Sequence, residues 1–191
     1  TDSFRLAQAV MDAEEYKDFD ITVPNKSLDE LVKVMDNYHE NVNLYFSANR
    51  LLVKFKNVLF QTRLLDGNFP DTSRLIPAEF TQILSISTKE LVGAVDRASI
   101  LLTEKNNVVK LNMDTDEVFV SSKSMEVGYV VEKLNEYSYE GEKLTISFSA
   151  KYLLDAIRAL ASEEISLHFT GDMKPIIIKS ETNPDLTQLI L

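Results

Sequence analysis

The chain has 191 residues, of which 45% are hydrophobic, and its 20 Lys and Arg against 30 Asp and Glu give a formal charge of −10. This composition is typical of a globular protein with one or two domains. The absence of cysteine excludes disulfides, thiolate zinc sites and cysteine nucleophiles. Only His39 and His168 could supply imidazole ligands, so no metal ion is expected.

The five glycines stand too far apart to form a G-x-G-x-x-G or Walker loop, so no nucleotide cofactor is expected. No apolar run is long enough to span a membrane, and the first residues do not resemble a signal peptide. These features, with the lack of cysteine, favour a cytoplasmic protein without membrane contact. The chain begins at Thr1 without Met and ends inside the apolar run 189–191, so we expect it to be a fragment of a longer protein.

One pattern occurs three times along the chain, with a short alternating segment, a turn, a Lys and a helical pattern in each copy. The copies begin with residues 21–28, 84–91 and 146–153. The alternating segments predict strands and the residues after them predict helices. The second copy contains Ser87-Thr88-Lys89-Glu90, which matches a capping box and predicts a helix start.

Each predicted helix has apolar residues at i, i+3, i+4 and i+7, the spacing of one buried face. These positions are Leu28, Leu31, Val32 and Met35; Leu91, Ala94, Val95 and Ala98; and Leu153, Ala156, Ile157 and Leu160. Alternating segments after the helices predict strands at 42–46, 51–55, 58–64, 108–113, 118–122, 129–134, 165–169, 176–179 and 186–191.

The fold class is therefore α+β, with a β-α-β-β-β unit used three times. One such unit leaves an apolar sheet face or edge exposed, whereas two units packed together make a natural domain. Copies two and three are contiguous, so residues 78–191 are expected to form one domain. Residues 1–77 hold the unpartnered first copy, and the Pro-bounded segment 69–77 is the predicted linker.

Five blocks of the chain then point to one family. They are Thr1–Leu6, Thr62–Asp71, Arg74–Pro77, Arg97–Leu101 and Ile146–Leu160. In this order they resemble bacterial sliding clamps, the β subunits of the replicative DNA polymerase III, and the Leu-x-Gly-x-Phe-Pro-Asp pattern of the second block is specific. The resemblance implies a non-catalytic processivity factor whose subunits have three domains, each of two β-α-β-β-β units. Residues 1–77 would be the second half of the middle domain and 78–191 the C-terminal domain.

The resemblance also implies that two subunits close a ring around double-stranded DNA, with helices on the inner face and sheets on the outer. Basic side chains on those helices would meet phosphates loosely, without reading sequence. The residues expected to face DNA are Lys26, Lys33, Arg74, Lys89, Arg97, Lys151 and Arg158. Acidic residues such as Asp29, Glu30, Asp96 and Asp155 on the same helices predict weak affinity, and solvated surface lysines are the simpler alternative.

A second implied site is a pocket that accepts linear motifs of the polymerase, the clamp loader and repair proteins, through apolar anchors. Carried over by motif, its lining is Thr1, Ser3, Phe4, Arg5, Leu6, Pro77, Tyr152, Met173, Pro175, Leu189, Ile190 and Leu191. Phe4 stands where many family members have His, which predicts a more apolar floor. The strand before Thr1 and a C-terminal Pro-x-Arg tail are absent from this sequence, so the pocket is expected to be incomplete.

A third implied site is the dimer edge, where Ile100 and Leu101 match family positions that contact the first domain of the other subunit. A helix end packed into the core is the alternative for both residues. The full-length protein is expected to be a homodimer associated with the nucleoid, whereas this chain alone is not expected to close the ring.

Two other functions compete with the clamp. Catalysis would need a nucleophile, a base or an acid pair. Glu163-Glu164 and Asp114 with Asp116 are possible pairs, but Asp114–Glu117 reads as a hairpin turn. His168 is expected at a sheet surface or edge. A protein-interaction module without DNA contact is the stronger alternative.

Overall fold

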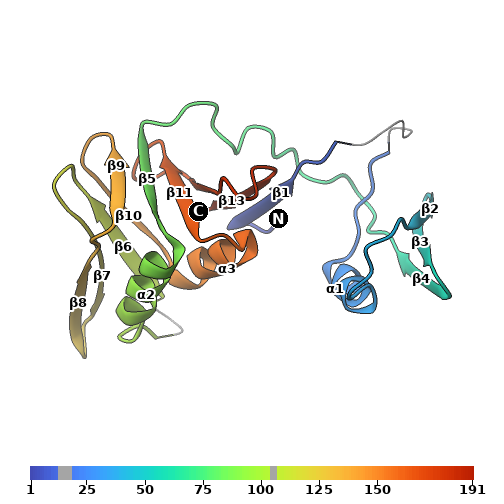
Figure 1. Ribbon diagram of the computed structural model, residues 1–191, viewed down its shortest axis with the longest axis horizontal. Helices are drawn as coiled ribbons and strands as arrows, with labels where there is room; N and C mark the ends of the chain where they lie inside the picture. The colour runs from blue at the N-terminus through green and yellow to red at the C-terminus, as the bar shows by residue number, and fades with distance from the viewer. Residues whose placement is uncertain (13–18, 104–106) are drawn as a thin grey trace. The chain divides into compact units, whose positions relative to one another are not determined.

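The computed structural model describes residues 1–12, 19–103 and 107–191, which belong to two compact units. Unit 1 comprises Thr1–Asp12 and Thr72–Leu191, and unit 2 comprises Ala13–Asp71. The strand nearest the N-terminus therefore lies in the same unit as the C-terminal part of the chain. Figure 1 labels the helices and most of the strands of both units.

Unit 1 is built from two antiparallel sheets. The larger one has the strand order β1 (Arg5–Ala9), β13 (Leu186–Ile190), β12 (Ile176–Lys179), β11 (Glu164–Phe169), β5 (Gln82–Ser87) and β9 (Tyr137–Glu140). The smaller one has the order β10 (Leu144–Ser149), β6 (Val108–Met113), β7 (Val118–Ser124) and β8 (Gly128–Lys133).

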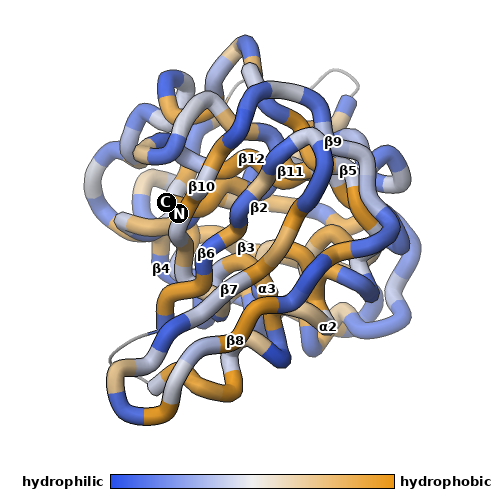
Figure 2. Tube along the Cα trace, turned by 90° about the vertical axis from the view of Figure 1, so that its left-hand side faces the viewer, coloured by the Kyte–Doolittle hydropathy of each residue, from blue (hydrophilic) through white to orange (hydrophobic). Residues whose placement is uncertain are grey.

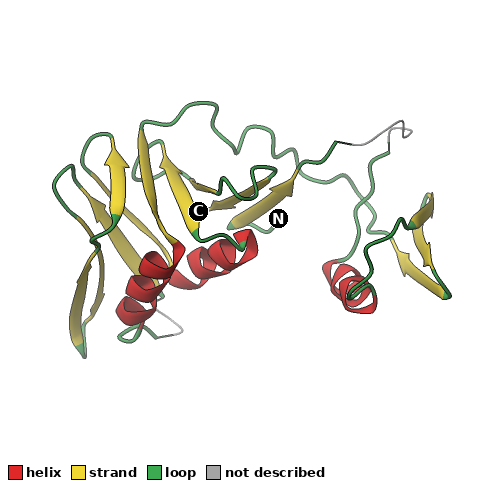
Figure 3. Cartoon of the chain, viewed as in Figure 1, coloured by secondary structure: helices red, strands yellow, loops and turns green. Residues whose placement is uncertain are grey.

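The two repeats of unit 1 exchange strands with each other. Strand β5 opens the first repeat but pairs with β11 of the second, and β10 opens the second repeat but pairs with β6 of the first. Helices α2 (Thr88–Ser99) and α3 (Ala150–Leu160) pack against each other and against the sheets. Figure 3 shows both helices on one side of unit 1. Neither repeat therefore has a complete sheet without the other.

The core of unit 1 combines the apolar helix faces with the inner side chains of the strands. On β10, Leu144, Ile146 and Phe148 are buried while the residues between them are exposed. The predicted faces of α2 and α3 are buried along their whole length. Figure 2 shows hydrophobic residues along β10, β11 and β12 and hydrophilic residues in many loops. Burial of these faces is the main contribution to the stability of the unit.

Unit 2 contains one repeat, with α1 (Asn25–Val34) beside a sheet of β2 (Asn43–Ser47), β3 (Arg50–Phe55) and β4 (Val58–Arg63). Its core is small, and Leu31 and Met35 of the predicted helix face pack on it. Leu28 and Val32 of the same face are exposed, so the prediction of one buried face is wrong for them. The reason is that the described part of unit 2 offers a single sheet, which covers only one side of α1.

The strand predicted at residues 21–23 is also not formed. Its backbone is linked to a neighbour by a hydrogen bond from the Leu65 amide to the Thr22 carbonyl, at 2.9 Å. A strand needs a ladder of such bonds, and none of the described strands pairs with this segment. All the other predicted strands and the three helices are confirmed within about two residues, as expected for element boundaries.

Two further differences concern the start of α2 and the segment after β8. The predicted helix start is confirmed, with Ser87 as the N-cap residue, but the hydrogen bonds of a capping box are absent. Ser87 makes no capping side-chain bond, and Glu90 instead accepts the backbone amides of Asn135 and Glu136, at 2.5 and 3.2 Å. Strand β9, which the sequence did not predict, follows directly and pairs with β5. Glu90 thus anchors the chain between β8 and β9 to the first turn of α2.

We expect Glu90→Ala to lower the free energy of unfolding of unit 1 by about 1–2 kcal/mol, because two backbone amides lose a charged acceptor. Urea denaturation followed by circular dichroism measures this change. The matched control is Glu79→Ala at an exposed position, expected to change stability by less than about 0.5 kcal/mol. Equal effects of the two substitutions would show that the Glu90 contacts contribute nothing.

Candidate functional site

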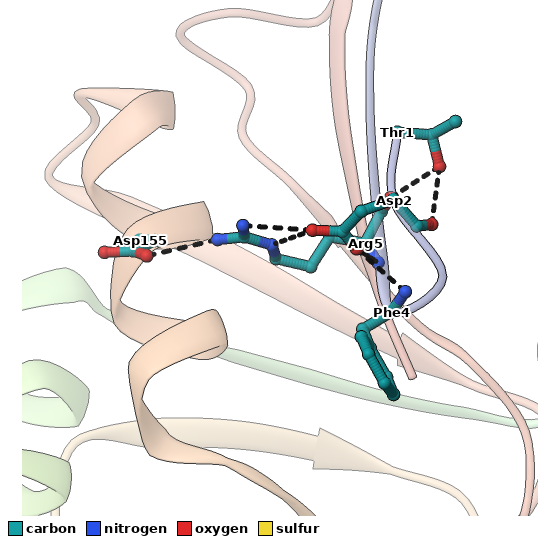
Figure 4. A network of polar contacts seen from close by, with 5 residues as sticks. All are labelled: Thr1, Asp2, Phe4, Arg5 and Asp155. Carbon is teal, nitrogen blue, oxygen red and sulfur yellow. Dashed lines mark hydrogen bonds and ion pairs between the residues drawn. The ribbon is translucent and has the colours of Figure 1, made fainter. Parts of the chain in front are cut away.

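The residues before β1 form a hydrogen-bonded turn. One carboxylate oxygen of Asp2 accepts the backbone amides of Phe4 and Arg5, each at 2.8 Å, and the Thr1 hydroxyl donates to the Arg5 carbonyl at 2.6 Å (Figure 4). The amide of Phe4, and then the side chain and amide of Arg5, hold the pKa of Asp2 below its usual 3.8. Asp2 is therefore ionised at neutral pH and keeps the turn closed.

Arg5 connects this turn to helix α3. Its guanidinium lies 3.1 Å from an Asp2 oxygen and 3.2 Å from an Asp155 oxygen. It also covers the ring of Tyr152, 4.6 Å from the ring centre. Each ion pair is about 40% exposed and so adds little stability by itself. Together the contacts set the orientation of Arg5, and Arg5 sets the position of the Tyr152 ring.

Phe4 and Tyr152 form an aromatic pair at the surface. Their ring centres are 5.9 Å apart and the ring planes meet at 28°, a stacked arrangement. Phe4 is 54% exposed although it is a large apolar side chain, and Tyr152 is half-buried. The backbone amide of Leu191 donates to the Phe4 carbonyl at 2.9 Å, so Leu191, whose side chain is exposed, lies beside Phe4. An exposed apolar surface with a rigid aromatic pair is suited to binding apolar side chains.

Strand β1, which follows this turn, pairs with β13, so that Arg5 is opposite Ile190 and Leu6 is opposite Leu189. Leu6, Leu189 and Ile177 form a small buried cluster, and Ile190 belongs to the main core. Leu6, Leu189 and Ile190 therefore expose almost no surface to a ligand. These three residues belong to the packed core next to the site and do not line its surface.

The segment before β5 packs on the same small cluster through Ile76 and Phe80, with the half-buried Pro77 between them in the sequence. The Phe80 ring meets His168 edge-on, with 4.9 Å between ring centres. The prediction of His168 at a sheet edge is wrong, because β11 is an interior strand. His168 alternates with the buried residues of β11 and is itself half-buried. Burial, and then nearby Lys179, lower the pKa of His168, so its ring is neutral at pH 7.

The remaining predicted pocket residues lie outside the helices and strands. Met173 and Pro175 are in the turn between β11 and β12, where Met173 is exposed and Pro175 half-buried, and Ser3 is exposed in the turn before β1. A cavity of about 410 Å³ lies elsewhere, in unit 2, between aromatic residues that include Phe19, Phe46 and Phe69. None of the predicted pocket residues lines that cavity.

Asp2 and Asp155 are not among the predicted pocket residues, although both pair with Arg5. Asp is typical of Asx-turns, in which its carboxylate accepts backbone amides a few residues on, so the residue type could have suggested a turn at Asp2. Asp155 gives no comparable signal, because its contact with Arg5 depends on two elements that are 150 residues apart in the chain.

The residues expected to face DNA are all exposed, but they are not equally available. They are Lys26 and Lys33 on α1, Arg74 in the linker, Lys89 and Arg97 on α2, and Lys151 and Arg158 on α3. Lys33 pairs with Glu30 at 2.9 Å, Arg97 with Glu132 at 2.9 Å, and Arg158 with Asp155 at 3.9 Å. These acidic partners reduce the positive potential of the helices.

The predicted dimer edge lies at the end of α2. Ile100 is 77% exposed and Leu101 is half-buried. Strand β8, which packs beside α2, is the edge strand of its sheet and exposes Tyr129 and Val131. The alternative that Ile100 is packed in the core is therefore wrong.

Within the described ranges, no group of three or more His, Asp or Glu side chains is placed to hold a metal ion. Nor does any helix of those ranges have the length and hydrophobicity needed to cross a bilayer. The contacts between the β1 turn and α3 offer aromatic stacking, apolar contact and one guanidinium paired with carboxylates, which is the chemistry of a recognition surface.

Comparison with known proteins extends these observations. Residues 1–71 match the family model of the DNA polymerase III beta subunit central domain, and residues 73–191 match that of its C-terminal domain. The beta sliding clamp of Bacillus subtilis is 46% identical over 195 residues, covering all of this chain and 52% of the relative. The chain thus spans about half the length of the curated relatives it matches.

Solved structures agree with this assignment. The DNA polymerase sliding clamp from Bacillus subtilis matches with a TM-score of 0.93 and 45% identity, over all of this chain and 51% of that one. A sliding clamp from Bartonella birtlesii bound to griselimycin matches with a TM-score of 0.94 and 27% identity, over 100% and 52% of the two chains. Since both family models match in order and together cover nearly the whole sequence, the chain belongs to the family of bacterial sliding clamps, the beta subunits of DNA polymerase III.

Proposed function

We propose that this chain is part of a DNA sliding clamp, a processivity factor that encircles duplex DNA and tethers the replicative polymerase without chemistry of its own. It would carry the second half of the middle domain in residues 1–77 and the C-terminal domain in residues 78–191. The observation that supports this most directly is the contact between the β1 turn and α3, where Phe4, Arg5 and Tyr152 meet in a chain related to clamps over its full length.

The surface formed by Phe4, Tyr152 and Leu191 is the proposed seat of partner peptides. Its apolar groups would hold the anchor side chains of linear motifs from the polymerase, the clamp loader and repair proteins. Arg5 is matched by Asp2 and Asp155, so apolar contact dominates over attraction of an acidic peptide. The complex of the Bartonella relative with griselimycin supports a ligand site in this fold.

DNA contact is proposed to be weak and independent of sequence, through the exposed basic residues of the three helices. Homodimerisation of the full-length protein through the region of Ile100 and Leu101 would close the ring, and the exposure of Ile100 supports this. The complete clamp would act in the cytoplasm at the nucleoid. The pairing of Lys33, Arg97 and Arg158 with acidic residues favours a second candidate, a protein-interaction module without direct DNA contact.

Tyr152→Ala is expected to weaken binding of a fluorescent clamp-binding peptide, with a Gln-led motif ending in Leu-Phe, by about 30-fold or more, because a central aromatic anchor is lost. Fluorescence anisotropy measures the change. Tyr129→Ala removes an exposed tyrosine of β8 and is the matched control, with unchanged affinity expected.

Equal loss of affinity in both tyrosine variants, or none in either, would contradict the proposed peptide site. If the folded chain binds no peptide at all, the same titration is repeated after addition of an upstream strand and a C-terminal Pro-x-Arg tail. Binding restored by these additions and lost again in Tyr152→Ala would support the site, whereas continued absence of binding would reject it.

For DNA, Lys151→Gln is expected to lower the slope of log affinity against log salt by about 1, since one phosphate contact is lost whatever the sequence. Anisotropy of a labelled duplex in increasing salt measures this slope. The control is Lys123→Gln on β7, also exposed, which should leave the slope unchanged. Salt-independent or undetectable DNA binding by the unmodified chain would favour the interaction module instead.

A further inference from the structure

Residues 76–80, which we call the strap, lie on the face of the larger sheet that points away from the main core of unit 1. Ile177 of β12 is on this face, because its two neighbours in the strand belong to the main core and side chains alternate along a strand. Ile76 and Phe80 of the strap pack on Ile177 and on the other buried members of its cluster, Leu6 and Leu189. The strap is therefore held on the sheet by apolar contact.

One titratable side chain lies on the same face beneath the strap. His168 of β11 is opposite Ile83 of β5 and opposite Ile177 of β12, so it continues the row of side chains that the strap covers. Its ring meets the Phe80 ring edge-on, with 4.9 Å between ring centres. The Lys179 ammonium lies 5.8 Å from the centre of the same Phe80 ring. A cation is thus already present where the strap and His168 meet.

The hydrogen bonds of the His168 ring fit its neutral form. Nε2 lies 2.8 Å from the Ser166 hydroxyl, whereas Nδ1 is buried and has no hydrogen-bond partner among the described residues. A neutral ring with its proton on Nε2 donates to Ser166 and leaves only a lone pair on Nδ1. Protonation adds an N–H group at Nδ1, and a buried donor without an acceptor costs free energy. The docked strap therefore covers the neutral ring more favourably than the charged one.

The charges around His168 do not compensate for an added proton. Burial, and then the cation of Lys179 on β12, lower the pKa of His168 from its usual 6.5. Strands β5 and β13 carry no charged residue. The other charged residues on the strap, on β9, on β11 and in the turn after β11 are all exposed, and none is within ion-pair distance of the ring; they are Glu79, Glu140, Glu164, Asp172 and Lys174.

We propose that residues 76–80 are an acid-sensitive strap, which is docked on the sheet while His168 is neutral and is released when this ring takes up a proton. Release uncovers the apolar cluster around Ile177 and frees the first part of unit 1 that follows unit 2 in the chain.

The direction of the pH dependence follows from proton linkage. The docked ring binds a proton less readily than the released ring, whose pKa returns to about 6.5. Docking is therefore strongest above pH 6.5, and it weakens as the pH falls through 6.5 towards the lower pKa of the docked ring. Because one proton is involved, the docking constant falls by at most about tenfold per pH unit.

Methyl NMR of the 191-residue chain with labelled isoleucine, from about pH 8 to about pH 5, tests the proposal. The Ile76 methyl signal is expected to move reversibly towards its position in an exposed side chain, with the same midpoint as the His168 ring proton and below pH 6.5. Ile177 should report the same midpoint. Ile157, which is buried in the main core, is the internal control and should not change.

Two variants separate His168 from the only other histidine. His168→Gln keeps a donor for Ser166 but cannot be charged, so the acid transition of Ile76 is expected to disappear. His39→Gln, at an exposed position in unit 2, is the matched control and should retain the transition. Lys179→Gln removes the nearby cation and should move the midpoint to higher pH, because the charged ring is then opposed less. Circular dichroism at each pH distinguishes release of the strap from unfolding.

Titration of the His168 ring without any change at Ile76 would overturn the proposal, and so would an acid transition that persists in His168→Gln. Docking that strengthens as the pH falls would also overturn it, since that is the effect of a cation–π contact between a charged ring and Phe80. If His168→Gln does not fold, Lys179→Gln decides, and an unchanged midpoint in that variant would reject the proposal.

Discussion

The structure depends on one constraint, which is that a single β-α-β-β-β repeat cannot cover its own apolar surfaces. Its helix has two apolar sides to bury and its sheet has an edge to pair. The strands of one repeat cover one side of the helix and leave the sheet edge unpaired. Unit 1 solves this by exchanging the opening strands β5 and β10 between repeats and by packing α2 against α3. In unit 2 the same residue pattern leaves Leu28 and Val32 in solvent. Burial of apolar surface therefore acts between repeats as much as within them.

Strand β1 shows that sequence assignment and packing can divide the chain differently. Residues 1–71 match the central-domain family model, yet β1 pairs with β13 and belongs to unit 1. The burial of Leu6 beside Ile177 and Leu189 accounts for this, because the outer edge of β13 is filled by a strand of matching length. The consequence for function is that the proposed peptide surface is assembled within one compact unit.

The candidate site relies on orientation more than on interaction strength. The ion pairs of Arg5 are half exposed and individually weak, but they fix a guanidinium over Tyr152 and, through the Asp2 turn, the backbone that carries Phe4. A preformed aromatic surface loses little conformational freedom when a ligand binds, which favours recognition of short peptides. Because Asp2 and Asp155 offset the charge of Arg5, apolar contact is the main source of affinity expected at this site.

The sequence alone determined the helices, nearly all strands and the repeat, because hydrophobic periodicity is local and the residues at i, i+3, i+4 and i+7 report which face is apolar. It also led to the proposal of Phe4, Arg5 and Tyr152 as site residues, through their place in family motifs. Only the tertiary structure decided which of these residues touch, that Glu90 binds the chain before β9 instead of capping α2, and that residues 21–23 form no strand. These outcomes depend on partners far away in the sequence, or on a partner that the repeat does not contain. Local pattern records that a surface is apolar, but the presence of a complementary surface decides whether it is buried.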